Sequence, residues 1–119
     1  MELSYKEIRA QICDVCHKMW QLGWVASNDG NVSVKLSDGT FLATPTGVSK
    51  SMVTPEMIVH INKAGEMIET VDGYRPSSEM RMHFRCYEER KDVGAVLHAH
   101  PPLSLIHISE PTRPRLISY

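Results

Sequence analysis

The chain has 119 residues, with a hydrophobic share of 42% and a charged share of 23%, which are ordinary values for one globular domain. Thirteen basic and 14 acidic residues give a formal net charge of −1, so the electrostatic footprint of a nucleic-acid binder or of a polybasic membrane protein is absent. No apolar run approaches the roughly 20 residues that span a bilayer, and Glu2 and Glu7 stand where a signal peptide carries basic and then apolar residues. We therefore expect a cytoplasmic protein.

The first expected element is an amphipathic helix over residues 5–22. Ser4 and Glu7 form an S-x-x-E capping box at its start. Apolar residues then recur at helical spacing, and Gly23 can end the helix.

Two of the three cysteines lie on this helix, in the C-x-x-C-H sequence Cys13, Cys16 and His17. This sequence is the attachment pattern of c-type haem, so a haem electron-transfer protein is one hypothesis. Haem attachment requires export, and no export signal is visible. Cys16 also falls on the apolar face of the helix, which favours two buried thiols. An odd number of cysteines predicts no disulfide framework.

The middle of the chain predicts short strands joined by turns. Alternating apolar and polar residues, with Asp38-Gly39 as a two-residue turn signal, indicate a first hairpin. A second hairpin is expected after a short helix that begins at Thr54. The four strands are residues 32–36 with 40–44, and residues 58–61 with 67–70.

A second main helix is expected from Ser77 to about Arg90, followed by a short buried strand over residues 93–97. Because a helix followed directly by a strand packs antiparallel to it, the start of this helix should lie beside the end of this strand. His83, one turn after Glu79 on the same helix face, is expected to pack in the core, with a hydrogen bond to Glu79 as the alternative.

The expected strand leads into His98 and His100, and Pro101 ends it. Histidines at i and i+2 on a strand point to the same face, so both imidazoles can bind one metal ion. The alternative is two polar residues at a strand end. Zinc in enzymes usually takes three protein ligands, so this pair alone is an incomplete site.

The expected helix start would add a carboxylate and an anion site to these histidines. Glu79 supplies the carboxylate, while Ser77 and Ser78 supply hydroxyl and backbone N–H groups at a helix N-terminus, where an anion is favoured. Further small and hydroxyl residues of the kind that approach phosphate closely are Gly30, Asn31 and Thr44-Pro45-Thr46-Gly47. The alternative is ordinary capping and turn residues.

Four blocks of residues resemble the class II aldolase/adducin family in order and spacing over about residues 4–102. They are Gly30-Asn31-x-Ser33, Thr44-Pro45-Thr46-Gly47, Arg75-Pro76-Ser77-Ser78-Glu79 and Asp92-Val93-Gly94-Ala95-Val96-x-His98-x-His100-Pro101-Pro102. The resemblance implies an α/β fold, a three-layer α/β/α sandwich with a mostly antiparallel central sheet. It also implies a Zn²⁺-dependent aldolase acting on a small sugar phosphate, and a homotetramer.

The resemblance also assigns roles to individual residues. His98 and His100 match two of three zinc ligands, and Glu79 matches the catalytic acid/base. The substrate-phosphate contacts are matched by Asn31, Thr46, Gly47, Ser77 and Ser78. Glutamate at position 79 favours an aldolase over the family's epimerases, and a dehydratase stays open. The family's third zinc histidine lies further downstream, and His107 is not accepted as that ligand.

Residues 103–119 differ in character from the rest of the chain, with two prolines in a short stretch. They resemble translated sequencing adaptor, and the alternative is a natural surface tail. We therefore expect residues 1–102 to be the N-terminal part of a longer family domain, truncated at the C-terminus.

The 119-residue chain by itself is then expected to be inactive and aggregation-prone, with an unpaired sheet edge or an exposed apolar face. The extended protein, in which the native downstream sequence follows residue 102, is expected to be soluble, oligomeric and zinc-dependent.

Overall fold

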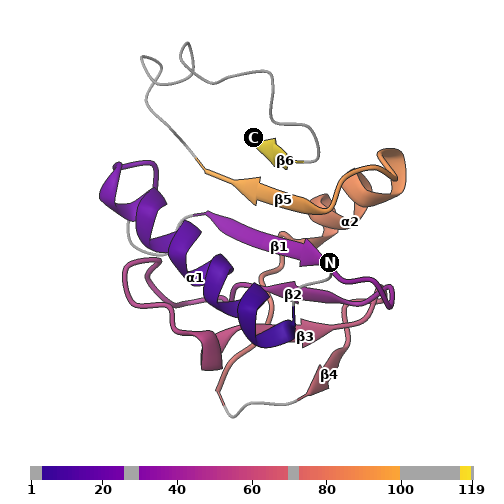
Figure 1. Cartoon of the computed structure of the whole chain (residues 1–119), viewed down its shortest axis with the longest axis horizontal. Helices are drawn as coiled ribbons and strands as arrows, with labels where there is room; N and C mark the ends of the chain where they lie inside the picture. Colours follow the sequence, from indigo (N-terminus) through magenta and orange to yellow (C-terminus); the bar gives the residue numbers. More distant parts are fainter. Residues whose placement is uncertain (1–3, 26–29, 70–72, 100–115, 119) are drawn as a thin grey trace.

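The computed structural model describes residues 4–25, 30–69, 73–99 and 116–118, which form three layers (Figure 1). Helix α1 (Tyr5–Gln21) lies on one face of a sheet and helix α2 (Met80–Glu89) on the other. The strands are β1 (Asn31–Lys35), β2 (Phe41–Ala43), β3 (Val59–Ile61), β4 (Met67–Glu69), β5 (Ala95–His98) and β6 (Leu116–Ser118), with a 3₁₀ turn η1 (Pro55–Met57) before β3. Within these described ranges no helix is long and apolar enough to cross a membrane.

The strands lie in the order β4-β3-β2-β1-β5-β6. Every neighbouring pair is antiparallel except β5 and β6, which run parallel. The expected three-layer α/β/α architecture with a mostly antiparallel sheet is therefore confirmed. The chain returns through α2 to place β5 beside β1. These two strands are therefore neighbours in the sheet although β2, β3 and β4 separate them in the sequence.

Both expected hairpins and both expected helices form, with shifted ends. Helix α2 begins at Met80 rather than Ser77, because Glu79 is its N-cap residue and the Ser77 hydroxyl accepts a hydrogen bond from the Glu79 N–H at 3.1 Å. Strand β5 begins at Ala95 rather than Val93, because the Val93 N–H is bonded to the carbonyl of Arg90 in the turn that closes α2.

Helix α1 starts at the predicted capping box, in which Ser4 and Glu7 exchange two hydrogen bonds of 3.1 Å. Its apolar face packs on the sheet, and Cys13 and Cys16 are 4% and 0% exposed there. Burial raises the pKa of the two thiols to about 11 and about 12. Two neutral thiols inside the core fit the interpretation as packing residues and do not present a surface for haem attachment.

The opposite face of the sheet packs against α2 through an apolar cluster that includes Phe41, Tyr87 and Val96. Two polar side chains, Ser33 of β1 and His83 of α2, are fully buried in the same layer. Buried polar groups need hydrogen-bond partners, and those of Ser33 and His83 lead to the candidate site.

Part of the predicted foreign tail joins the sheet. Leu116 and Ile117 pair with Ala95 and Val96 of β5 in parallel register. These tail residues therefore cover the backbone of β5, and β6 becomes the edge strand on that side of the sheet. The expectation of an unpaired edge or an exposed apolar face stays a prediction. The rest of the predicted tail, residues 103–115 and 119, lies outside the described residues.

Gly30, directly before β1, lies against the backbone of His98 at the end of β5. Its φ is +82°, and an added Cβ would lie 2.6 Å from Val25 Cγ1 and 2.8 Å from the His98 carbonyl oxygen. We expect Gly30→Ala to lower the free energy of unfolding of the extended protein by roughly 3 kcal/mol, from left-handed strain plus steric overlap. Urea denaturation measures this change.

Gly39→Ala is the matched control, since Gly39 has a φ of +87° but nothing within 4 Å of the added Cβ. It should cost about 1 kcal/mol, from backbone strain alone. Equal losses of unfolding free energy in the two variants would show that the close approach to His98 does not contribute to the destabilisation.

Candidate active site

The candidate site lies where the start of α2 meets the end of β5. Glu79 is the N-cap residue of α2, and His98 is the last residue of β5. The Nδ1 atom of His98 lies 2.8 Å from Oε2 of Glu79. The expected proximity of this helix start and this strand end is therefore confirmed.

Asn31 contacts the same carboxylate from β1. It stands opposite His98 in the β1–β5 register, and its side-chain Nδ2 donates to Oε2 of Glu79 at 2.5 Å. This hydrogen bond is the main reason that the pKa of Glu79 lies below its ordinary value; burial opposes it, and His98 adds to it. The Glu79 side chain is 45% exposed, so a charged carboxylate faces solvent at this point.

The loops with the predicted phosphate contacts meet beside this carboxylate. An isolated β-bridge between Pro45 and Pro76 joins residues 44–47 to residues 75–78. The Thr46 N–H donates to the carbonyl of Arg75 at 2.8 Å. The bridge thus brings loops that are about 30 residues apart in the chain into one region (Figure 1).

The predicted phosphate contacts differ in their accessibility. Asn31 is buried, with 4% of its surface exposed, and Ser77 is half-buried. The exposed members are Thr46, Gly47 and Ser78, and Gly47 has the positive φ of +77° that glycine adopts readily. A turn of this kind leaves room for an anion at its backbone.

His83 is buried in the core as expected, and its hydrogen bonds go to Asn31 and Ser33, two partners that the sequence analysis did not identify. Its ring Nδ1 lies 2.6 Å from Ser33 Oγ, and its Nε2 is hydrogen-bonded to the side-chain oxygen of Asn31. Burial is the main cause that lowers its pKa to about 4. The available signal was the i, i+2 spacing of Asn31 and Ser33, which places both on the strand face that α2 covers.

The donors in the described part of the site are of the kinds that zinc takes. His98 provides an imidazole and Glu79 a carboxylate. Within residues 4–25, 30–69, 73–99 and 116–118, no group of three or more such side chains is close enough to hold a metal ion. His100, the second predicted ligand, and His107 lie outside the described residues. The fit to zinc is therefore one of donor chemistry.

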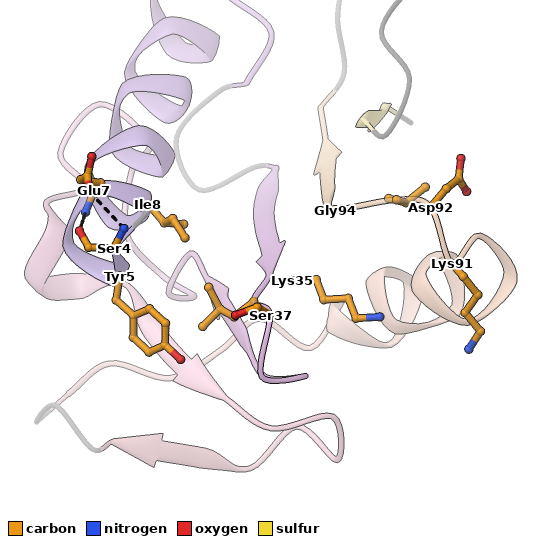
Figure 2. A pocket seen from close by; sticks show the side chains of 11 residues that line it. Ser4, Tyr5, Glu7, Ile8, Lys35, Ser37, Lys91, Asp92 and Gly94 are labelled. Atoms are coloured by element: carbon orange, nitrogen blue, oxygen red, sulfur yellow. Dashed lines mark hydrogen bonds between the residues drawn. The ribbon is translucent and has the colours of Figure 1, made fainter. Parts of the chain in front are cut away.

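A hollow of about 910 Å³ lies elsewhere, between the start of α1 and the far end of β1 (Figure 2). Ser4, Lys35 and Asp92 are among the residues that line it. Lys35 ends β1 whereas Asn31 begins it, and none of the predicted site residues lines this hollow. The candidate site is thus defined by its polar contacts and not by this depression.

Residues 10–112 match the family described as Class II Aldolase and Adducin N-terminal domain. This chain belongs to the class II aldolase/adducin family. The match runs past residue 102, so the start of the foreign tail stays a prediction.

Individual relatives agree with this assignment. The chain is 42% identical over 98 residues to the L-fuculose phosphate aldolase of Escherichia coli (strain K12), a match that covers 82% of this chain and 44% of the relative. It is 36% identical over 89 residues to the methylthioribulose-1-phosphate dehydratase of Gluconacetobacter diazotrophicus, covering 75% of this chain and 42% of the relative. The solved L-fuculose-1-phosphate aldolase from Thermus thermophilus superposes with a TM-score of 0.67 at 27% identity, covering 84% of this chain and 50% of that one. The chain thus spans about half the length of these relatives or less.

The buried imidazole of His83 predicts a pH dependence of stability. Its folded-state pKa of about 4 lies below the ordinary value of 6.5, so protons bind more tightly to the unfolded chain. The neutral ring's contribution is complete above pH 6.5 and is lost as the pH falls toward 4. From pH 7 to pH 5 the extended protein should lose about 2 kcal/mol more stability than its His83→Gln variant. Urea denaturation at both pH values measures this difference, and identical losses in the two proteins would contradict it.

Proposed function

We propose that the extended protein is a zinc-dependent aldolase that cleaves and forms a carbon–carbon bond in a small sugar phosphate. The observation that carries the proposal is the partly exposed Glu79 carboxylate, held between the Asn31 amide at the start of β1 and the His98 imidazole at the end of β5. A charged carboxylate beside a candidate metal ligand is what proton transfer next to a carbonyl requires. Family membership and the relatives named above support the same reaction class.

In this proposal His98 and His100 hold the zinc ion. When bound, zinc supplies Lewis-acid stabilisation of the negative charge that develops on the substrate's oxygens. The phosphate is held by Asn31, Thr46, Gly47, Ser77 and Ser78. These contacts orient the substrate and do not take part in the bond chemistry.

Glu79 is the group that moves the proton. Bond cleavage next to a carbonyl leaves an enediolate, and the hydroxyl on the departing carbon loses its proton as the aldehyde forms. Glu79 in its protonated form would deliver one proton to the enediolate carbon, so that the protons balance, and its carboxylate would remove that proton in the reverse direction. The hydrogen bond from Asn31 stabilises the charged form of Glu79, so the resting carboxylate is ready to accept the proton in the synthetic direction. Its partial exposure leaves it accessible to a substrate.

We propose a ketose 1-phosphate as the substrate class. The relatives include proteins named for L-fuculose 1-phosphate and for methylthioribulose 1-phosphate, both ketose phosphates. Aldol cleavage between C3 and C4 of any ketose 1-phosphate releases dihydroxyacetone phosphate, whatever the rest of the sugar. A phosphate site close to Glu79 suits this shared three-carbon half.

A dehydratase acting on a similar substrate is the second candidate, because one relative carries that activity in its name. An epimerase of the same family is a third. The products distinguish the three: an aldolase releases an aldehyde and dihydroxyacetone phosphate, a dehydratase releases water and keeps the carbon skeleton, and an epimerase leaves the molecular formula unchanged. We further propose a homotetramer in the cytoplasm as the working form.

Replacing His98 or His100 with alanine in the extended protein should abolish stoichiometric zinc, because two imidazoles are the core of the proposed ligand set. Elemental analysis of the purified variants measures the zinc content. His17→Ala is the control, since His17 bonds the Val53 carbonyl away from the site, and it should keep zinc. A full zinc complement in the His98→Ala, His100→Ala double variant would refute the assignment.

Glu79→Gln in the extended protein should keep zinc and phosphate binding but lower turnover by roughly 10²-fold or more, because an amide cannot accept the proton. An aldol-cleavage assay with added Zn²⁺ measures turnover. Glu88→Gln, at an exposed position of the same helix, should leave turnover unchanged. Near-normal turnover in Glu79→Gln would remove Glu79 from this role.

A further inference from the structure

A continuous chain of buried polar side chains runs through the layer between α2 and the sheet to the Glu79 carboxylate. The Tyr87 hydroxyl lies 2.9 Å from Ser33 Oγ, which lies 2.6 Å from His83 Nδ1. His83 Nε2 contacts the side-chain oxygen of Asn31, whose amide nitrogen reaches Glu79 Oε2. The four residues behind Glu79 are each no more than 4% exposed.

The carboxylate at the end of this chain dictates the direction of its hydrogen bonds. A charged Glu79 only accepts, so the Asn31 amide must turn its nitrogen toward Glu79 and its oxygen toward His83. His83 must then donate from Nε2, which leaves Nδ1 to accept the Ser33 hydroxyl proton. This requires a neutral ring protonated at Nε2.

Without His83, the Asn31 amide would be held in this orientation by Glu79 alone. An asparagine side chain can rotate its amide by a half-turn, which would present its oxygen to the carboxylate and place two acceptors against each other. The ring N–H of His83 favours the productive rotamer, because only that rotamer offers it an acceptor. His83 therefore acts on Glu79 through Asn31, without contact to the substrate.

We propose that His83 is a positioning residue for proton transfer, which holds the Asn31 amide in the rotamer that orients and stabilises the Glu79 carboxylate. The inference rests on the proposed aldolase function and adds to it a residue from the buried layer. The surrounding layer is apolar, with Phe41, Val96 and Met80 in the same cluster. An apolar side chain at position 83 would complete that layer without any polar partner, so the imidazole is not required for packing.

The test compares His83→Leu with His83→Gln in the zinc-loaded extended protein. Glutamine carries an N–H group near the position of Nε2 and a carbonyl oxygen that can accept from Ser33, whereas leucine keeps only the volume. We expect His83→Leu to lower kcat by about 10-fold or more, because the hydrogen bond from Asn31 to the charged Glu79 is weakened when Asn31 loses its partner. Zinc content should change by less than about threefold, KM should change less than kcat because Asn31 is one of five proposed phosphate contacts, and His83→Gln should recover most of kcat.

Proton exchange isolates the step that this inference concerns. With dihydroxyacetone phosphate alone in D₂O, the rate at which a C3 proton is replaced by deuterium reports the proton transfer, and NMR measures it. We expect His83→Leu to slow this exchange as much as it slows turnover. Equal kcat and equal exchange in wild type and His83→Leu would overturn the proposal, as would a folded His83→Gln variant as slow as His83→Leu.

If the His83→Leu variant fails to fold, two further measurements still test the proposal. Ser33→Ala removes only the hydroxyl that fixes the His83 tautomer and should lower kcat by about threefold or more, with KM unchanged; unchanged kcat would count against the proposal. The ¹⁵N spectrum of the unaltered protein should show His83 neutral and protonated at Nε2, and a ring protonated at Nδ1 would overturn it. Absence of aldol cleavage and of proton exchange in the wild-type protein would instead refute the proposed function.

Discussion

The antiparallel pairing of β1 with β5 is the constraint on which the rest of this molecule depends. It joins the two hairpins to the unit formed by α2 and β5, and it sets Asn31 directly opposite His98. Gly30 permits this pairing, since a side chain there would overlap the His98 carbonyl. With that register in place, the N-cap residue Glu79 reaches both Asn31 and His98. The pairing of β1 with β5 therefore determines both the sheet order and the positions of the candidate catalytic residues.

Local signals predicted much of this architecture from the sequence. The capping box at Ser4 and Glu7 and the turn at Asp38-Gly39 are complete within a few residues, so α1 and the first hairpin could be predicted without tertiary information. The closeness of Glu79 and His98 followed from a helix leading directly into a strand. The resemblance to the class II aldolase/adducin family supplied the architecture and the candidate roles.

The features that escaped prediction depend on contacts between distant parts of the chain. Ser33 alternates with Val32 and Val34, a pattern typical of a strand with one solvent-exposed face. In the fold, however, α2 covers that face and Ser33 is completely buried. Its link to His83 joins residues 50 positions apart. The pairing of the tail residue Leu116 with β5 likewise depends on a tertiary edge that no local pattern reveals.

The direction of the buried hydrogen bonds has an electrostatic consequence. From Tyr87 to Asn31, each bond dipole turns its positive end toward Glu79, so the dipoles add rather than cancel at the carboxylate. They sit in a layer that excludes solvent, where such fields are screened far less than in water. Because the packed layer fixes these groups, this field exists before a substrate arrives and needs no reorientation when charge moves. The packed core thus provides a fixed electrostatic field that stabilises the negative charge of Glu79 at the surface of the protein.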